Sequence, residues 1–432
     1  MRITAAYTTD NWDWLKQKFM RVIICNTTDH GGGAANAALR LHAALSSQHV
    51  ESLVAVMEKT QERPGVHALS SRLRKTLQPF LRQMERAPLL LYPHRDRHSL
   101  FSPSWRPSLV HHTLEAQNPD IIHLHWIEDS FLPLYSLARL PRPVVWTLHD
   151  VWALTGGCHL FKKCQHYRTG CHDCPQLNSK SRYNLASFLF AAKRHAYHRV
   201  RPTIIAPSRY MAELARQSSL LGTCRIEHIP NTLDTEVFRP IDKATARKLL
   251  RLPSADFIIA FGAVNANSDL NKGCDLLVGA LQELMRLGRK DISCAVFGGY
   301  AAPRNFPLPL HNLGVLRDDT SLALTYAAAD VFVCPSRDEN LPYTVMESLA
   351  CGTPVVAFDI GGMADLVEQG KTGFLVPPYD SGEMAAQLAA LVDAIPLRQT
   401  MGEAARKKIL AEYAPAIIAL RHKRLYQELL NP

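Results

Sequence analysis

The chain has 432 residues, 47% of them hydrophobic, and a formal net charge of +10. This length suffices for two domains with separate cores, and no apolar run reaches the ~18 residues that would span a bilayer. Ten cysteines are too sparse for a disulfide scaffold, so we expect a reducing, cytoplasmic setting. Residues 1–200 carry 25 Lys and Arg against 14 Asp and Glu. This half is expected either to meet an anionic partner or to expose a solvated basic face.

The first regular elements are expected after a polar N-terminal stretch. Residues 1–19 lack the apolar core of a signal peptide, so we interpret them as an extension or as the product of an upstream start. From Met20 the sequence reads "MRVIICNTTDHGGGAANAALRLHAALSSQH". It predicts a strand, a glycine-rich turn and an amphipathic helix, which together begin an α/β layer.

Strand-like and helical segments then alternate along the chain. A first series of apolar runs includes "DIIHLHW", "PVVWTLHD" and "TIIAPS"; a second, starting near residue 250, includes "DFIIAFGA", "DVFVCPS" and "PVVAFD". This alternation predicts parallel sheets, and we expect an α/β protein of two Rossmann-like parallel-sheet domains facing a cleft. The expected divisions are 20–240 with a Cys-rich insertion at 156–178, then 241–415, then a helix over 416–432 packed back on the first domain.

A basic amphipathic helix is predicted over residues 68–88. Its apolar residues recur at helical spacing and its basic residues fall on the other face: Leu73, Leu77, Phe80, Leu81 and Met84 against Arg72, Arg74, Lys75, Arg82 and Arg86. Such a helix can lie on an anionic membrane or pack on its own domain, and the sequence leaves both interpretations open. Pro79 is expected to kink it or to divide it in two.

The most informative stretch is residues 334–380, which holds Glu339 and Glu347 eight positions apart. A strand is expected to end at Cys334 and a helix to begin near Tyr343. Glu339 then lies at the carboxyl edge of a parallel sheet, where open α/β sheets bind their ligands. Two carboxylates there suit a polyhydroxylated ligand, because each accepts hydrogen bonds from neighbouring hydroxyls.

This stretch resembles the E-x7-E region of the family 4 glycosyltransferases. Four further segments carry the same resemblance: "HGGGAANAALRLHAAL" (30–45), "VVWTLHD" (144–150), "IPNTLDTEVFRP" (229–240) and "NKGCDLL" (271–277). Together they extend it over nearly all of residues 20–430. The succession "WTLHD", "TGGC" and "TGCHDCP" is most similar to bacterial exopolysaccharide glycosyltransferases of the colanic acid type.

The resemblance implies a GT-B fold and transfer of a sugar from a nucleotide diphosphate sugar with retained configuration. Glu347 would hold the nucleotide ribose and Glu339 the hydroxyls of the donor sugar, helped by the backbone N–H groups of Asn340 and Leu341. Lys272 would neutralise the departing diphosphate, where charge develops in the transition state. A catalytic metal is therefore not expected.

The same resemblance assigns roles to the first domain. His149 would lie near the anomeric carbon of the sugar and join Lys272 and Glu339 as a catalytic residue. Gly32 and Gly33 would let the backbone approach the donor phosphates or the acceptor. One feature of the family is missing: "FGAVNANSDLNKG" has no Arg to share the phosphate with the lysine. The candidates to replace that Arg are Asn265, Asn267 and Arg209.

Four cysteines stand in "CHLFKKCQHYRTGCHDC" at C-x5-C-x6-C-x2-C spacing. The final C-x2-C is typical of zinc ligands, so we predict a structural zinc held by Cys158, Cys164, Cys171 and Cys174, with free thiols as the alternative. The pair His123 and His125 in "DIIHLHW" is interpreted as two buried histidines rather than as metal ligands.

The expected partners are a nucleotide diphosphate sugar, a lipid-linked glycan acceptor of bacterial surface polysaccharide biosynthesis, and an anionic membrane surface. No nucleic acid is expected, and the protein would work in the cytoplasm or on the inner face of the plasma membrane. Two alternatives remain open at this point. One is another nucleotide-sugar enzyme of the same fold, such as an epimerase, and the other is a zinc-bearing protein that binds nucleic acid.

Overall fold

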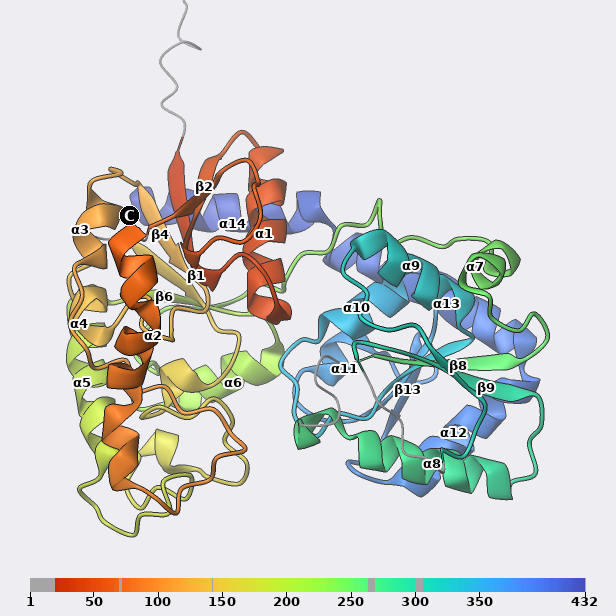
Figure 1. The fold of residues 1–432 in the computed structure, drawn as a ribbon. Helices are drawn as coiled ribbons and strands as arrows, with labels where there is room; N and C mark the ends of the chain where they lie inside the picture. Colours follow the sequence, from red (N-terminus) through yellow and green to blue (C-terminus); the bar gives the residue numbers. More distant parts are fainter. Residues whose placement is uncertain (1–19, 70–71, 142, 263–268, 300–305, 432) are drawn as a thin grey trace, which may run out of the picture.

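The computed structural model describes residues 20–69, 72–141, 143–262, 269–299 and 306–431 (Figure 1). These residues form two α/β units, each built on its own parallel sheet, and a last helix that returns to the first unit. The predicted fold class, two Rossmann-like parallel-sheet domains, is confirmed. Asn265 and Asn267, proposed above for phosphate contact, lie outside the described residues.

The first domain is built on a seven-stranded parallel sheet with the order β3-β2-β1-β4-β5-β6-β7. Its central strands are buried along their whole length, so their sequences are continuous apolar runs instead of alternating patterns. The strands are β1 (Arg21–Thr28), β2 (Glu51–Glu58), β3 (Val66–Ala68), β4 (Ile121–Leu124), β5 (Val144–Thr147), β6 (Thr203–Ala206) and β7 (Ile226–His228).

The helices of this domain follow the local cues in the sequence. The longest, α5 (Leu185–Val200), starts where Asn184 and Ser187 cap each other's backbone N–H groups. Of the two alternatives given for Pro79, a kink or a division into two helices, the division is wrong, since α2 (Arg72–Arg86) continues through Pro79 as one helix. The others are α1 (Gly32–Ser46), α3 (Val110–Glu115), α4 (Leu134–Leu137), α6 (Arg209–Gln217) and the short 3-10 turns η2 (Ala87–Leu91), η3 (Trp152–Leu154) and η4 (His166–Arg168).

The second domain has a six-stranded parallel sheet with the order β10-β9-β8-β11-β12-β13. Its strands are β8 (Phe257–Gly262), β9 (Ile292–Phe297), β10 (Leu310–Asn312), β11 (Val331–Cys334), β12 (Val355–Phe358) and β13 (Gly373–Val376). Its helices are α7 (Lys243–Leu250), η5 (Leu270–Lys272), α8 (Cys274–Arg286), α9 (Asp319–Ala328), α10 (Tyr343–Ala350), α11 (Met363–Leu366), α12 (Ser381–Asp393) and α13 (Ile395–Glu412).

The last helix, α14 (Pro415–Leu430), leaves the second domain and packs on the first. Its Ile418 and Leu425 are buried in the same apolar cluster as Leu41 and Leu45 of α1. Figure 1 shows α14, in blue, lying beside the red α1. The core of the first domain therefore contains residues from both ends of the chain.

Candidate active site

The predicted lysine and glutamate of the donor side are brought together. Glu339 lies in the loop between β11 and α10, and its Oε1 is 2.8 Å from Nζ of Lys272. Lys272 ends the short turn η5, and the next residue, Gly273, has a φ of +67°. A Cβ on Gly273 would lie 1.9 Å from the carbonyl oxygen of Pro335, so only glycine allows this approach to the Glu339 loop. The negative charge of Glu339 raises the pKa of Lys272, which keeps the ammonium charged.

Glu347 is buried one turn inside α10, with both carboxylate oxygens engaged. Nη2 of Arg40, on α1 of the other domain, lies 3.0 Å from Oε1 of Glu347, and the Tyr326 hydroxyl donates to Oε2 at 3.0 Å. The guanidinium of Arg40 also lies over the ring of Tyr343, 4.5 Å from its centroid. Burial raises the pKa of Glu347, and Arg40 opposes that rise. The carboxylate thus acts here as one side of an inter-domain ion pair, a contact that sequence reasoning missed.

His149 follows the end of β5 and is hydrogen-bonded to a second, buried histidine. Its Nε2 shares a hydrogen bond of 2.8 Å with Nδ1 of His125. Burial lowers the pKa of His149 to about 4, so the imidazole is neutral near pH 7. Further inside, His123 bonds the Tyr426 hydroxyl and the Thr147 hydroxyl, each at 2.7 Å. The interpretation of His123 and His125 as buried histidines is confirmed.

Asp150 is the clearest site residue that sequence reasoning left without a role. Its Oδ2 accepts hydrogen bonds from Nε1 of Trp126 at 3.0 Å and from Nδ1 of His159 at 2.7 Å, and its Oδ1 accepts from the backbone N–H of Trp152 at 2.8 Å. Burial would raise its pKa, but these donors, His159 foremost, lower it. Its position directly after His149 was the available sequence cue. Asp150 fixes the Cys-rich segment, through His159, to the end of β5.

The glycine-rich turn of the first domain faces the start of α10. Gly31 and Gly32 have φ of +68° and +82°, and a Cβ on Gly33 would lie 3.8 Å from the ring of Tyr343. Arg209, the third candidate for phosphate contact, begins α6 with a largely exposed side chain, and its Nε lies 3.7 Å from Asp365 of the second domain. Gly33 and Arg209 therefore both lie near residues of the second domain.

Asn340 and Leu341 lie in the loop that follows β11, and they anchor this loop to the two domains. Asn340 reaches across the interface, and its Nδ2 donates to the carbonyl oxygens of Leu148 at 2.9 Å and His149 at 3.3 Å. Leu341, next to it, is buried in the core of the second domain. The loop from Glu339 to Leu341 thus joins the donor-side lysine, the other domain and its own core.

The four clustered cysteines lie beyond Asp150, between β5 and α5. Cys171 and Cys174 are buried, and the backbone N–H of Gly156 donates to Sγ of Cys171 at 3.2 Å. Burial raises the pKa of the Cys158 and Cys171 thiols to about 12. Across the described ranges, no three His, Cys, Asp or Glu side chains are arranged to hold a metal ion. A structural zinc on these cysteines stays a prediction.

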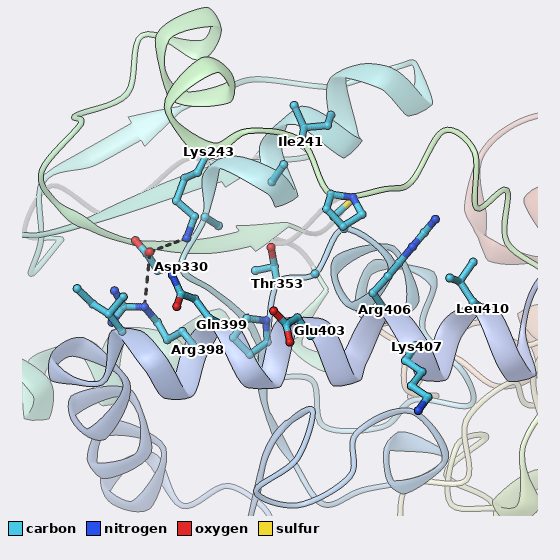
Figure 2. A pocket seen from close by; sticks show the side chains of 18 of the residues that line it. Ile241, Lys243, Asp330, Thr353, Arg398, Gln399, Glu403, Arg406, Lys407 and Leu410 are labelled. Carbon is cyan, nitrogen blue, oxygen red and sulfur yellow. Dashed lines mark hydrogen bonds and ion pairs between the residues drawn. The ribbon is translucent and has the colours of Figure 1, made fainter.

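A cavity of about 960 Å³ lies away from all of these residues (Figure 2). Its lining includes Asp330 and Pro354, which precede β11 and β12, together with residues of α13. Asp330 is paired there with Lys243 and Arg398, as Figure 2 shows. The cavity is therefore at the amino ends of the strands. Because α/β sheets bind their ligands at the carboxyl ends, we do not assign the cavity to the active site.

Comparison with known proteins agrees with the site geometry. The family described as "Glycosyltransferase Family 4" matches residues 31–237, and "Glycosyl transferases group 1" matches residues 256–394. D-inositol 3-phosphate glycosyltransferase 2 of Catenulispora acidiphila is 35% identical over 186 residues, 39% of this chain and 43% of that protein. The putative colanic acid biosynthesis glycosyl transferase WcaC of Escherichia coli is 27% identical over 378 residues, 82% of this chain and 87% of WcaC. The chain thus matches less than half the length of the first relative and most of the second.

Solved structures share the fold. Sucrose-phosphate synthase from Thermosynechococcus elongatus superposes with a TM-score of 0.68 at 18% identity, over 95% of this chain and 99% of that one. Anabaena Alr3699/HepE, solved with UDP-glucose, gives a TM-score of 0.64 at 18% identity, over 95% and 100% of the two chains. The epimerase and nucleic-acid-binding alternatives find no support in these matches. With both halves of the chain matched and the GT-B fold in place, the protein belongs to the family 4 glycosyltransferases and is a glycosyltransferase enzyme.

Proposed function

We propose that the protein transfers a sugar from a nucleotide diphosphate sugar, with retained anomeric configuration, to a lipid-linked glycan of a bacterial surface polysaccharide. The observation that carries this proposal is the ion pair between Lys272 and Glu339, which is joined through Asn340 to the end of the strand that presents His149. A cation and a carboxylate at that edge suit a diphosphate and a sugar respectively. The structural relative HepE was solved with UDP-glucose, which supports a donor of this class.

Each residue then has a chemical task. As the bond between the sugar and the diphosphate breaks, negative charge grows on the leaving oxygen, and the Lys272 ammonium stabilises that state more than the ground state. Glu339 accepts hydrogen bonds from the sugar hydroxyls. Neutral His149 forms a hydrogen bond with the sugar near the reacting carbon. The turn at Gly32 and Gly33 lets the backbone approach the phosphates or the acceptor.

The role proposed for Glu347 includes a displacement. For the ribose hydroxyls to reach its carboxylate, Arg40 must release Oε1, while its bond of 3.2 Å to Asp319 can persist. Donor binding then exchanges an inter-domain ion pair for hydrogen bonds to the nucleotide. The N–H groups of Asn340 and Leu341 would add to the grip on the donor.

The membrane part of the proposal rests on α2 and η2. On α2 the polar side chains Gln78 and Glu85 face inward and are buried, while Phe80 is 60% exposed; on η2, Leu90 and Leu91 are 77% and 79% exposed. These apolar side chains point outward, whereas a helix packed on its own domain turns its apolar side chains inward. An outward apolar stripe suits insertion into a lipid surface. No helix in the described part of the chain is long and apolar enough to cross a bilayer. We therefore propose peripheral binding to the inner face of the plasma membrane.

The donor is tested by incubating the protein with a panel of UDP- and GDP-sugars, with and without a lipid diphosphate–sugar acceptor. We expect one donor to release nucleotide diphosphate, faster with the acceptor. Glu339→Gln should abolish that release, while Glu283→Gln, which alters a half-buried glutamate on α8 paired with Arg286, should not. Conversion of the sugar without release of diphosphate would instead identify an epimerase, and no turnover of any donor would refute the proposal.

Membrane binding is tested by flotation with vesicles of phosphatidylglycerol or of phosphatidylcholine. We expect binding to the anionic vesicles only and its loss in the double variant Phe80→Ser, Leu90→Ser. Leu249→Ser, which alters an equally exposed leucine (63%) on α7 of the other domain, serves as the control. Equal flotation of all three proteins would contradict a role for α2 and η2.

A further inference from the structure

The side chain of Asn340 is fixed at both ends by the other domain. Its Nδ2 donates to two carbonyl oxygens, those of Leu148 and His149, and its Oδ1 accepts a hydrogen bond of 2.7 Å from the Ser208 hydroxyl. Ser208 is fully buried and also accepts from the backbone N–H of Met211, which caps α6. Since carbonyl oxygens only accept, this is the one orientation of the amide that satisfies every partner.

The loop that carries Asn340 is equally constrained within its own domain. The backbone N–H of Gly362 donates to the carbonyl oxygen of Glu339 at 3.1 Å. A Cβ on Gly361 would lie 1.9 Å from that same oxygen, and a Cβ on Gly362 would lie 1.8 Å from the carbonyl oxygen of Asn340. The two glycines therefore allow a backbone contact that no other residue would permit. Hydrogen bonds from Asn340 connect this loop to the residues that follow β5 in the other domain.

We propose that Asn340 is a positioning residue, which sets the imidazole of His149 against the sugar held by Glu339. The inference rests on the sugar transfer proposed above and goes beyond it, because the family resemblance gave Asn340 only its backbone N–H. Glu339 and Asn340 are consecutive, so a single peptide unit carries both the sugar contact and the hydrogen bonds to the His149 backbone. Binding of the donor sugar to Glu339 is therefore coupled to the position of His149. Asn340 acts through His149 and need not touch the reacting atoms.

The substitution Asn340→Asp isolates this role. Aspartate has the same size and still accepts from Ser208, but it cannot donate to the two carbonyl oxygens and places a carboxylate against them. Asn431→Asp is the matched control, because the Asn431 amide donates to a carbonyl at the exposed end of α14. Melting temperatures of both variants establish that they fold.

Kinetics are measured with whichever UDP- or GDP-sugar of the panel is turned over. We expect Asn340→Asp to lower kcat by about tenfold to thirtyfold, the effect of losing two hydrogen bonds of ordinary net strength, with KM for the donor changed less than about threefold. In a His149→Ala background the same substitution should lower kcat by less than about twofold, because the imidazole through which Asn340 acts is absent. An equal loss of kcat in both backgrounds, or none in either, would overturn the proposal.

A second measurement needs no donor and separates this inference from the proposed function. Hydrogen exchange of the peptide spanning 144–152 should accelerate about tenfold in Asn340→Asp and stay unchanged in Asn431→Asp. If exchange is faster in Asn340→Asp but the protein turns over no donor, the coupling between the two domains stands and only the proposed sugar transfer is refuted. Unchanged exchange in Asn340→Asp would refute the positioning role itself.

Discussion

The buried pair between Arg40 and Glu347 gives a prediction that can be worked out in energy. Arg40→Met keeps most of the side-chain volume over Tyr343 but removes the charge that faces the Glu347 carboxylate, 3.0 Å away. Burial already raises the pKa of Glu347, so without Arg40 the carboxyl takes up a proton in the folded protein rather than remain charged. Protonation at pH 7 of a group with an ordinary pKa of 4.5 costs about 3.5 kcal/mol, at about 1.4 kcal/mol for each pH unit.

The cost depends on pH in a defined direction. In Arg40→Met the folded-state pKa of Glu347 lies above its unfolded value, so the folded protein binds more protons and stability falls as pH rises through that interval. At pH 5.5 the same protonation costs about 1.4 kcal/mol. The deficit relative to the wild type should therefore shrink between pH 7 and pH 5.5 by at most about 2 kcal/mol, because the pKa of Glu347 is raised in the wild type as well. Loss of the half-exposed Asp319 contact adds little, because solvent screens it.

Urea denaturation of both proteins at the two pH values measures this difference. The control places Arg40→Met in a Glu347→Gln background, where a neutral amide replaces the titrating carboxyl and the deficit should not vary with pH. The reasoning is refuted if the deficit of Arg40→Met is the same at pH 7 and pH 5.5, or if it varies equally in the Gln background.

Three further predictions follow from contacts at the site. Lys272→Ala should lower kcat about 100-fold or more with a smaller change in donor KM, because its charge acts mainly on the departing diphosphate; steady-state kinetics with the active donor would contradict this if kcat is retained. Gly273→Ala should destabilise the protein by about 1–3 kcal/mol and reduce activity, because residue 273 has a φ of +67° and its added Cβ would lie 1.9 Å from the Pro335 carbonyl oxygen. Thermal melting is followed by circular dichroism. A melting temperature equal to that of the wild type would contradict this close contact between residue 273 and Pro335. The purified protein should hold one zinc per chain by elemental analysis, lost in Cys171→Ser and kept in Cys294→Ser within β9; zinc-free wild-type protein would leave the clustered cysteines as free thiols.

Much of the fold could be predicted from the sequence for a physical reason. The central strands of both sheets are buried on both faces, so runs such as "VVWT" and "VVAF" stand out as uninterrupted apolar segments. Glu339 could be placed in advance at the carboxyl edge of a parallel sheet, because it follows a strand of that sheet. Lys272 was assigned to the donor side only through the family resemblance. The helix through Pro79 was less predictable, since packing decides whether a proline divides a helix.

The inter-domain contacts could not be predicted in the same way. Arg40 and Glu347 are 307 positions apart and on different domains. Glu347 stands out in the E-x7-E stretch, but Arg40 looks like an ordinary polar residue on an amphipathic helix. The side chain of Asn340 likewise has no local pattern that reveals its partners, because these lie 132, 191 and 192 positions earlier. Such contacts arise only when two folded surfaces meet, and no periodicity or spacing encodes them.

The return of α14 to the first domain has a consequence for the order of events during synthesis. Leu41 and Leu45 of α1 leave the ribosome before the second domain is made, but Ile418 and Leu425, which share their apolar cluster, leave it after that domain. The Tyr426 hydroxyl that bonds His123 arrives equally late. The first domain can thus reach its final packing only after the second domain has been synthesised, and a nascent chain stopped at the end of α13 would present uncovered apolar residues to chaperones and proteases.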